Sequence, residues 1–196
     1  NRVVSNYVEK NGSWGIDAST ESAYTRIAGN IVIDNGSGGI QTSYPTNEVV
    51  GNMCRSNANY GISLLATRSR AWSNVVEGRG RTWAGIYQSG TLTVVTNNTV
   101  RGCANEGIYV NANDARTVGN TVESNGAHGI HVYSGARNRV VSNRIDGKGK
   151  QGNGVYIEYA AGTVVTNNQM YRSTNYGVKV YGASGTTTNV VVNNRI

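Results

Sequence analysis

The chain lacks several features that would have pointed to common protein classes. Its 196 residues include no phenylalanine and one proline. No apolar run reaches the roughly 18 residues that a membrane-spanning helix needs, and no secretory leader stands at the start. Helical periodicity is absent, as are zinc-binding, phosphate-loop and catalytic-triad motifs. These absences exclude a membrane span, and they leave apolar residues that are mostly valine and isoleucine, which suit strands.

Acidic residues are also few. The chain has 11 acidic and 18 basic side chains, a formal net charge of +7. This balance favours an acidic partner, either an anionic polysaccharide or nucleic acid, but the arginines form no basic run, which disfavours nucleic acid. Calcium sites need clustered acids, whereas the aspartates are scattered, at Asp17, Asp34, Asp114 and Asp146. We therefore predict no metal site and no cofactor; calcium stays open without being indicated.

What the chain does contain is a repeat. A Gly-Ile or Gly-Val pair recurs eight times at intervals of 22 to 25 residues, beginning at Gly15, Gly39, Gly61, Gly85, Gly107, Gly129, Gly154 and Gly177. An asparagine keeps step with it, at Asn6, Asn30, Asn52, Asn74, Asn98, Asn120, Asn143, Asn168 and Asn194. Self-similarity at this period indicates one stacked unit per repeat.

Each unit has the pattern of short strands. Apolar and polar residues alternate at period two in 129–133 and 177–181, which is the period of a strand. A second strand precedes each repeated asparagine, as in 139–142, and a shorter third one follows it, as in 121–122. Three short strands per 22 to 25 residues predict an all-β parallel β-helix of about eight coils, a single domain over 1–196. Its length would be roughly 40 Å at one strand spacing per coil.

Two features of the repeat are expected to be structural. The asparagines should stack, their amides bonding along the column and to turn backbone. Cys54 and Cys103 fall two repeats apart, and layers about 4.8 Å apart then place them beyond the reach of a disulfide. We predict two free thiols, with Cys54 in the core.

The repeat also carries a family likeness. The stretch Asn120-Thr121-Val122-Glu123-Ser124-Asn125-Gly126-Ala127-His128-Gly129-Ile130 has the pattern Asn-x-Val-x-x-Asn-Gly-x-x-Gly-Ile. It resembles the right-handed parallel β-helix repeats of many polysaccharide lyases, mannuronan epimerases, some glycoside hydrolases, phage tailspikes and periplasmic NosD-type proteins. The resemblance covers essentially the whole chain. It implies a right-handed coil, a polysaccharide partner and an extracellular, periplasmic or cell-surface location.

Both ends of the chain fall in the same part of the repeat, in 1–6 and 190–196. Solenoids usually hide their last coil under a polar or helical cap, and none is visible here. We expect either a segment of a longer solenoid or ends covered by partners, with end-to-end or lateral self-association among the options.

The Gly-Ile pair predicts which side chains of its strand point outward. If the residue after the glycine points inward, those one and three places further on point outward. In the first coils these are mostly small and polar, whereas the later coils carry tyrosines and both histidines. Amphipathic rings along a sheet face suit sugar rings and their hydroxyls. We predict a saccharide-binding strip that includes Tyr87, Glu106, Asn111, Tyr133, Glu158, Tyr176 and Tyr181.

The family resemblance suggests a reaction on this strip. Uronate lyases and epimerases neutralise the sugar carboxylate and remove the proton at carbon 5; the lyase then expels the 4-linked sugar, and the epimerase returns a proton to the other face. On this resemblance His131 or Tyr109 would be the base and Tyr156 or His128 the acid. Lys179, with a rim arginine, would bind the carboxylate. A tyrosine base would need its pKa lowered from about 10 by a neighbouring cation.

Two other functions stay open. A tyrosine ladder stabilises neighbouring strands by about 0.2 to 1 kcal/mol per pair, which would fit a non-catalytic structural or adhesive solenoid such as a tailspike shaft. A glycoside hydrolase needs two carboxylates roughly 5 to 10 Å apart, and Glu106 and Glu158, two coils apart, could supply them.

A further outward column lies three residues beyond each repeated asparagine. Its charges alternate through Arg55, Glu77, Arg101 and Glu123, which predicts a surface charge ladder. The two repeats with insertions place basic residues in the turns that follow this column, namely Arg79, Arg81, Lys148 and Lys150. These turns would either overhang the strip and hold an anion or carry solvated charges.

Overall fold

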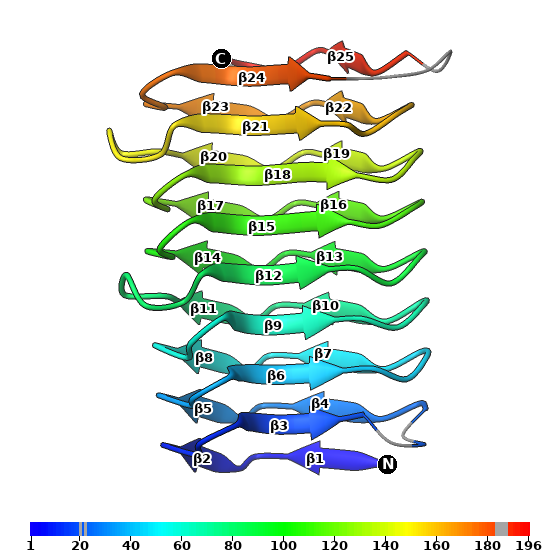
Figure 1. Cartoon of the computed structure of the whole chain (residues 1–196), viewed down its shortest axis with the longest axis vertical. Coiled ribbons are helices and arrows are strands. Elements are labelled where there is room, and N and C mark those ends of the chain that lie inside the picture. Colours follow the sequence, from blue (N-terminus) through cyan, green and yellow to red (C-terminus); the bar gives the residue numbers. More distant parts are fainter. Residues whose placement is uncertain (20, 22, 183–187) are drawn as a thin grey trace.

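The computed structural model describes residues 1–19, 21, 23–182 and 188–196. These residues form three parallel sheets that wind around one axis, with one strand of each sheet in each coil (Figure 1). The described part contains strands and no helix, so no helix there is long and apolar enough to cross a membrane. The predicted all-β parallel β-helix is confirmed.

The strand bounds show how regular the coil is. Sheet A has nine strands, β1 (Arg2–Val4), β4 (Arg26–Ala28), β7 (Glu48–Val50), β10 (Arg70–Trp72), β13 (Val94–Thr96), β16 (Arg116–Val118), β19 (Arg139–Val141), β22 (Val164–Thr166) and β25 (Val190–Val192). Sheet B has eight, β2 (Tyr7–Glu9), β5 (Ile31–Ile33), β8 (Met53–Arg55), β11 (Val75–Glu77), β14 (Thr99–Arg101), β17 (Thr121–Glu123), β20 (Arg144–Asp146) and β23 (Gln169–Tyr171). Sheet C has eight, β3 (Trp14–Ala18), β6 (Gly38–Thr42), β9 (Tyr60–Leu64), β12 (Ala84–Gln88), β15 (Glu106–Asn111), β18 (His128–Ser134), β21 (Asn153–Glu158) and β24 (Tyr176–Tyr181).

The core is a set of aliphatic columns set by this register. On sheet C, Ile62, Ile86 and Ile108 pair directly with one another along successive strands and are fully buried. Sheet A supplies Val49, and sheet B supplies Val76, to the same interior. The residue after each glycine therefore points inward, as the sequence predicted. At the two ends the outermost strands are less covered: all three valines of β25 are exposed, and Val3 of β1 is only partly buried.

The repeated glycines are required by close approach of one coil to the next. A Cβ on Gly107 would lie 2.4 Å from Cγ1 of Val122 and 2.5 Å from the carbonyl oxygen of Gly129. Real Cβ atoms are not found this close to other atoms, so any larger residue would push the coils apart. The glycine column thus lets the chain turn tightly from sheet B into sheet C.

The repeated asparagines form a hydrogen-bonded column through the turn between sheets A and B, which we call the asparagine ladder. Oδ1 of Asn98 accepts hydrogen bonds from the backbone N–H and the Nδ2 of Asn74, both at 2.9 Å. Its Nδ2 donates to Oδ1 of Asn120 at 3.0 Å and to two backbone carbonyls. The same pattern recurs at Asn30, Asn52, Asn120, Asn143 and Asn168. The ladder is scaffold, as expected.

The cysteines also match their prediction. Cys54 and Cys103 are both buried and unbridged. Burial raises the pKa of each thiol to about 12. Neither thiol is therefore an activated nucleophile.

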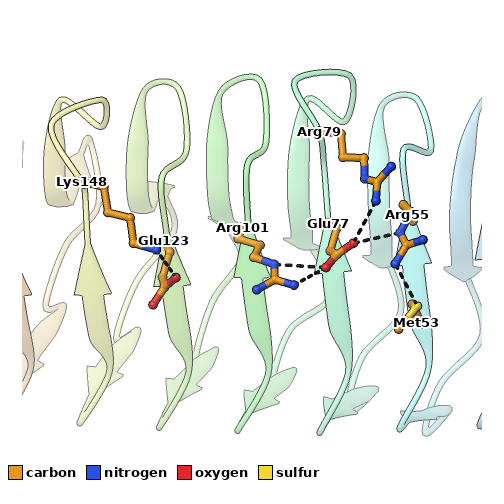
Figure 2. A network of polar contacts seen from close by, with 7 residues as sticks. All are labelled: Met53, Arg55, Glu77, Arg79, Arg101, Glu123 and Lys148. Carbon is orange, nitrogen blue, oxygen red and sulfur yellow. Dashed lines mark hydrogen bonds and ion pairs between the residues drawn. The ribbon is translucent and has the colours of Figure 1, made fainter.

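The outer face of sheet B carries the predicted charge ladder (Figure 2). Glu77 is its centre: Oε2 accepts from Nε of Arg55 at 2.9 Å, and Arg101 from the next coil bonds to Oε1. The guanidinium of Arg101 is the main reason why the pKa of the Glu77 carboxyl is lowered. Further along, Nζ of Lys148 lies 2.8 Å from Oε2 of Glu123.

The two inserted turns do not extend as an anion clamp over sheet C. They connect β11 to β12 and β20 to β21 and project from the side of the coil (Figure 1). Arg79 and Lys148 turn back to acids of sheet B, and Arg81 pairs with Asp34 at 3.2 Å. Within the described residues Lys150 forms no ion pair. The inserted turns therefore extend the sheet B charge network.

Candidate functional site

The outer face of sheet C carries a continuous column of aromatic rings, which we call the aromatic strip. Tyr60, Tyr87 and Tyr109 stack in successive coils with centroids 4.9 and 5.5 Å apart. The column continues through His131, 5.2 Å from Tyr109, to Tyr156, which stacks on His131 at 4.8 Å. Because these strands pair in register, the rings follow the axis of the coil. The strip ends at Lys179, whose Nζ lies 5.1 Å from the centroid of Tyr156.

Two tryptophans that were not predicted as site residues complete the early part of the strip. Trp14 stacks on Tyr60 at 6.4 Å, although the two lie two coils apart. Gly38 makes this contact possible, because a Cβ there would lie 2.3 Å from the ring of Trp14. Trp83 packs edge-on against Tyr60 and Tyr109. The one sequence feature that could have indicated Trp83 is its position directly before the strand that contains Gly85-Ile86.

A second line of tyrosines runs beside the strip at the ends of the later strands. Tyr133 contacts Tyr109 at 5.9 Å and Tyr159 at 6.1 Å, and Tyr159 contacts Tyr181 at 5.8 Å. These three side chains are exposed. Tyr159 was not predicted, because it follows its strand. The hydroxyl of Ser134 hydrogen-bonds to the predicted Asn111 at the same edge.

Tyr176 makes no ring contact with the strip among the described residues. It begins β24 and is opposite Asn153 in register. It is 57% exposed. Tyr176 is thus on the rim of the strip and not part of its stack.

The later coils enclose a charged cluster within the strip. Nδ1 of His131 lies 3.4 Å from Oε1 of Glu106, and Nε2 lies 3.1 Å from Oε2 of Glu158. His131 and Glu106 are 7% and 6% exposed, although both belong to outer-face columns. Aromatic rings on β15, β18 and β21 surround His131. Oε2 of Glu106 is buried and has no hydrogen-bond partner.

His128, the first residue of β18, also belongs to this cluster. Its ring centroid lies 5.3 Å from that of His131 and 4.8 Å from that of Tyr156. Its Nδ1 is 3.1 Å from Nδ2 of Asn153, whose Oδ1 is buried without a partner. Burial is the main cause that lowers the pKa of His128, so its imidazole is neutral at neutral pH. One ring nitrogen of each histidine and a carboxylate oxygen of Glu106 lie within 4.8 Å of one another, a grouping that could hold a metal ion.

The two tyrosines predicted to transfer protons, Tyr109 and Tyr156, differ from what a tyrosine base requires. Burial raises the pKa of Tyr109 well above its ordinary range. Burial, together with the carboxylate of Glu158, raises the pKa of Tyr156 to about 12. The ammonium group of Lys179 does not outweigh these effects. Both phenols stay protonated at neutral pH, which suits a proton donor better than an acceptor.

The comparisons with known proteins agree on the architecture. Residues 84–196 match the family model described as the right-handed beta helix region. An alginate lyase from Paenibacillus sp. str. FPU-7 superposes with a TM-score of 0.81 at 16% identity, over 100% of this chain and 76% of that one. The A-module of the mannuronan C-5 epimerase AlgE4 from Azotobacter vinelandii gives 0.74 at 15% identity, over 100% of this chain and 60% of that module.

Phage proteins show the same coil. Tailspike protein 3 of bacteriophage CBA120 superposes with a TM-score of 0.59 at 16% identity, over 99% of this chain and 41% of the tailspike. By sequence, no curated protein matches significantly. At these identities the likeness concerns the fold alone, and the chain spans 60% of the length of the epimerase module.

Proposed function

The chain belongs to the right-handed β-helix family, and we propose that it binds an anionic, uronate-containing polysaccharide along sheet C and processes it as a lyase or an epimerase. The observation that carries the proposal is the charged cluster of Glu106, His131 and Glu158 set into an otherwise aromatic strip. Rings bind the faces of sugars, and ionisable groups placed among them can transfer protons. The alginate lyase and the mannuronan epimerase module act on alginate and mannuronan by their names, and a further structural neighbour is named as the periplasmic alginate epimerase AlgG. These names support the same substrate class.

The geometry favours particular roles among the predicted residues. Lys179 lies beside Tyr156 at the end of the strip, where its ammonium group would neutralise the sugar carboxylate. His131, oriented by Glu158, would accept the proton from carbon 5, and the electrons of the C–H bond would move into the carboxylate as an enolate. The protonated phenol of Tyr156 would then donate a proton. In a lyase that proton goes to the leaving sugar oxygen as the C4–O bond breaks and a C4=C5 double bond forms; in an epimerase it goes to the opposite face of carbon 5.

The remaining predicted residues would serve binding. Tyr87 and Tyr109 stack on each other, so their ring edges and hydroxyls would face the saccharide. Tyr133 and Tyr181 add exposed rings on its flank, and Asn111 adds an amide. Since the pKa of Tyr109 is raised, we assign it to binding in preference to the role of base.

The test is an assay for products on alginate, pectate and glycosaminoglycans. Ultraviolet absorbance of an unsaturated sugar would report a lyase, proton NMR of the polymer an epimerase, and new reducing ends without unsaturation a hydrolase. We expect His131→Gln and Tyr156→Phe to lower the rate about 10²- to 10⁴-fold. Tyr171→Phe, on the outer face of sheet B, is the matched control and should keep the wild-type rate.

A non-catalytic binding or structural role is the second candidate. The tyrosine stack supports it, because ring contacts between coils stabilise the solenoid by themselves, and tailspikes share the fold. The absence of product with every polymer, together with saccharide binding that His131→Gln leaves unchanged, would establish this second role and overturn the enzyme.

A polysaccharide partner also bears on location. We propose an extracellular, periplasmic or cell-surface site of action, since one structural neighbour is named as a periplasmic alginate epimerase. Fractionation of cells that express the full-length protein, followed by immunodetection, tests this; recovery only in the cytosol would contradict it.

A further inference from the structure

We propose that Glu106, His128 and His131 bind one divalent transition-metal ion of the Zn²⁺ type. One ligand atom from each lies within 4.8 Å of the other two. Two imidazoles and one carboxylate form a known set of protein ligands for zinc, with the fourth position left to water or another oxygen. The three residues come from β15 and β18, which pair directly, so the sheet itself holds them together.

His131 lies between two carboxylates, and a neutral imidazole can donate a hydrogen bond to only one of them. When Nε2–H of His131 donates to Glu158, Nδ1 carries a lone pair that faces Oε1 of Glu106 at 3.4 Å. Two lone pairs repel unless a proton or a metal ion lies between them. For metal bonds of about 2.0 Å, tetrahedral geometry separates neighbouring ligand atoms by about 3.3 Å, close to the distance observed.

The charges of the cluster favour the metal over the proton. A buried carboxylate is costly unless it is paired, and Oε2 of Glu106 is buried without any partner. A protonated His131 would balance only one of the two flanking carboxylates. A divalent ion would balance both Glu106 and Glu158 and would offer Glu106 a second oxygen contact.

Groups behind the ligands are placed to orient them. Metal-binding histidines usually pass their other ring N–H to a carboxylate or carbonyl oxygen, which fixes the tautomer. Glu158 is in that position on Nε2 of His131. Asn153 contacts Nδ1 of His128, and a half-turn of its amide would let the unpartnered Oδ1 accept from Nδ1–H, leaving the lone pair of Nε2 for an ion.

Metal binding does not depend on the proposed reaction. An ion on Nδ1 of His131 would occupy the lone pair that the proton transfer uses. If both proposals hold, Zn²⁺ inhibits the reaction; if the chain is not an enzyme, the metal site remains. Binding and activity can therefore fail separately.

The experiment uses untagged protein freed of metal by chelation and dialysis. Titration calorimetry with Zn²⁺ should give one ion per chain, and Co²⁺ should give the visible absorption of a four-coordinate site. Glu106→Gln and His128→Gln should weaken binding more than 100-fold, and Glu158→Gln about 10- to 100-fold, as expected for a group behind the ligands. Glu123→Gln, which removes an acid from sheet B, is the control and should bind as the wild type does.

A second measurement needs no variant. The chain has only two histidines, and both belong to the proposed site, so the histidine-specific product of diethyl pyrocarbonate reports on it alone. Zn²⁺ should protect both from modification, whereas Mg²⁺ should not. The proposal is overturned if the wild type shows no Zn²⁺-dependent heat and no protection, or if Glu106→Gln and His128→Gln bind Zn²⁺ as tightly as Glu123→Gln does.

Discussion

The asparagine ladder and the Glu106–His131 cluster are both polar and both buried, yet they are satisfied to different degrees. Asn98 is 1% exposed, and its amide bonds to the coil before it, the coil after it and its own backbone turn. Glu106 is 6% exposed and keeps one oxygen without a partner. The ladder repeats one residue type, so each amide finds an identical amide one coil away. The cluster breaks the repeat, so its groups meet unlike neighbours and are left open to a ligand.

This difference separates scaffold from site in a repeat protein. A polar column whose members are identical can satisfy itself along the axis. A column whose members differ cannot, and a polar group left unsatisfied costs stability. Such a cost is tolerated where the group has another partner, such as a substrate or an ion.

The largest expected effect is the loss of one ladder residue. Asn98→Ala removes the acceptor of Asn74 and leaves several buried polar groups unpaired, each costing about 1–3 kcal/mol. We expect a loss of about 3–5 kcal/mol, measured by urea unfolding. Asn59→Ala, at an exposed asparagine, is the control and should change stability by less than about 0.5 kcal/mol. Equal effects of the two substitutions would show that the ladder is not what holds the coils together.

Substitution in the glycine column should give the next largest loss of stability. Gly107→Ala places a Cβ against Val122 and the backbone of Gly129, and such overpacking costs about 1–3 kcal/mol. A Cβ on Gly12 meets nothing within 4 Å, so Gly12→Ala should be close to neutral. The thermal unfolding temperatures of the two variants compare a glycine in close contact with the next coil, Gly107, with a glycine that has no such contact, Gly12.

The outer face of sheet B should give a smaller and pH-dependent effect. The guanidinium of Arg172 bonds to Asp146 and lowers the pKa of its carboxyl. In the unfolded chain the carboxyl of Asp146 has a pKa of about 3.9. It therefore binds its proton at a higher pH in the unfolded chain than in the folded protein. The stabilisation is complete above that value and is lost as the pH falls through the folded pKa.

The substitution Asp146→Asn tests the direction of this pH dependence of stability. At neutral pH we expect a loss of about 1 kcal/mol, because Arg172 is largely solvated. The difference from the wild type should shrink as the pH falls and vanish once the wild-type carboxyl is protonated. Urea titrations over a pH series would contradict the assignment if the difference stayed constant.

The smallest expected effect lies in the cluster itself. Glu106→Gln keeps the shape of the side chain and removes a charge that is only partly paired in the metal-free protein. We expect its stability to stay within about 1 kcal/mol of the wild type, in contrast to Asn98→Ala. The difference should widen when Zn²⁺ is added, because only the wild type gains binding energy. A large loss without metal would place Glu106 in the scaffold.

Much of the fold could be predicted because the repeat is local. Gly107, Ile108 and their equivalents set the period, and the alternation in 129–133 and 177–181 indicated the strands of sheet C. The candidate site was harder to predict from the sequence. Lys179, Tyr156 and Tyr109 could be placed on one face from register alone, but the contacts of Trp83 and Asn153 could not, since they depend on turns of irregular length and on side-chain direction.

The sequence by itself determined the coil, its period, its inward and outward faces and the two free thiols, because each follows from spacing along the chain. Only the tertiary structure decided that outward residues such as His131 are buried, that one carboxylate oxygen of Glu106 lacks a hydrogen-bond partner, and that the inserted turns carry their charges to sheet B. The physical reason is the same in each case. Burial and pairing on the outer face are set by neighbours one coil away, and these neighbours are different residues in every coil.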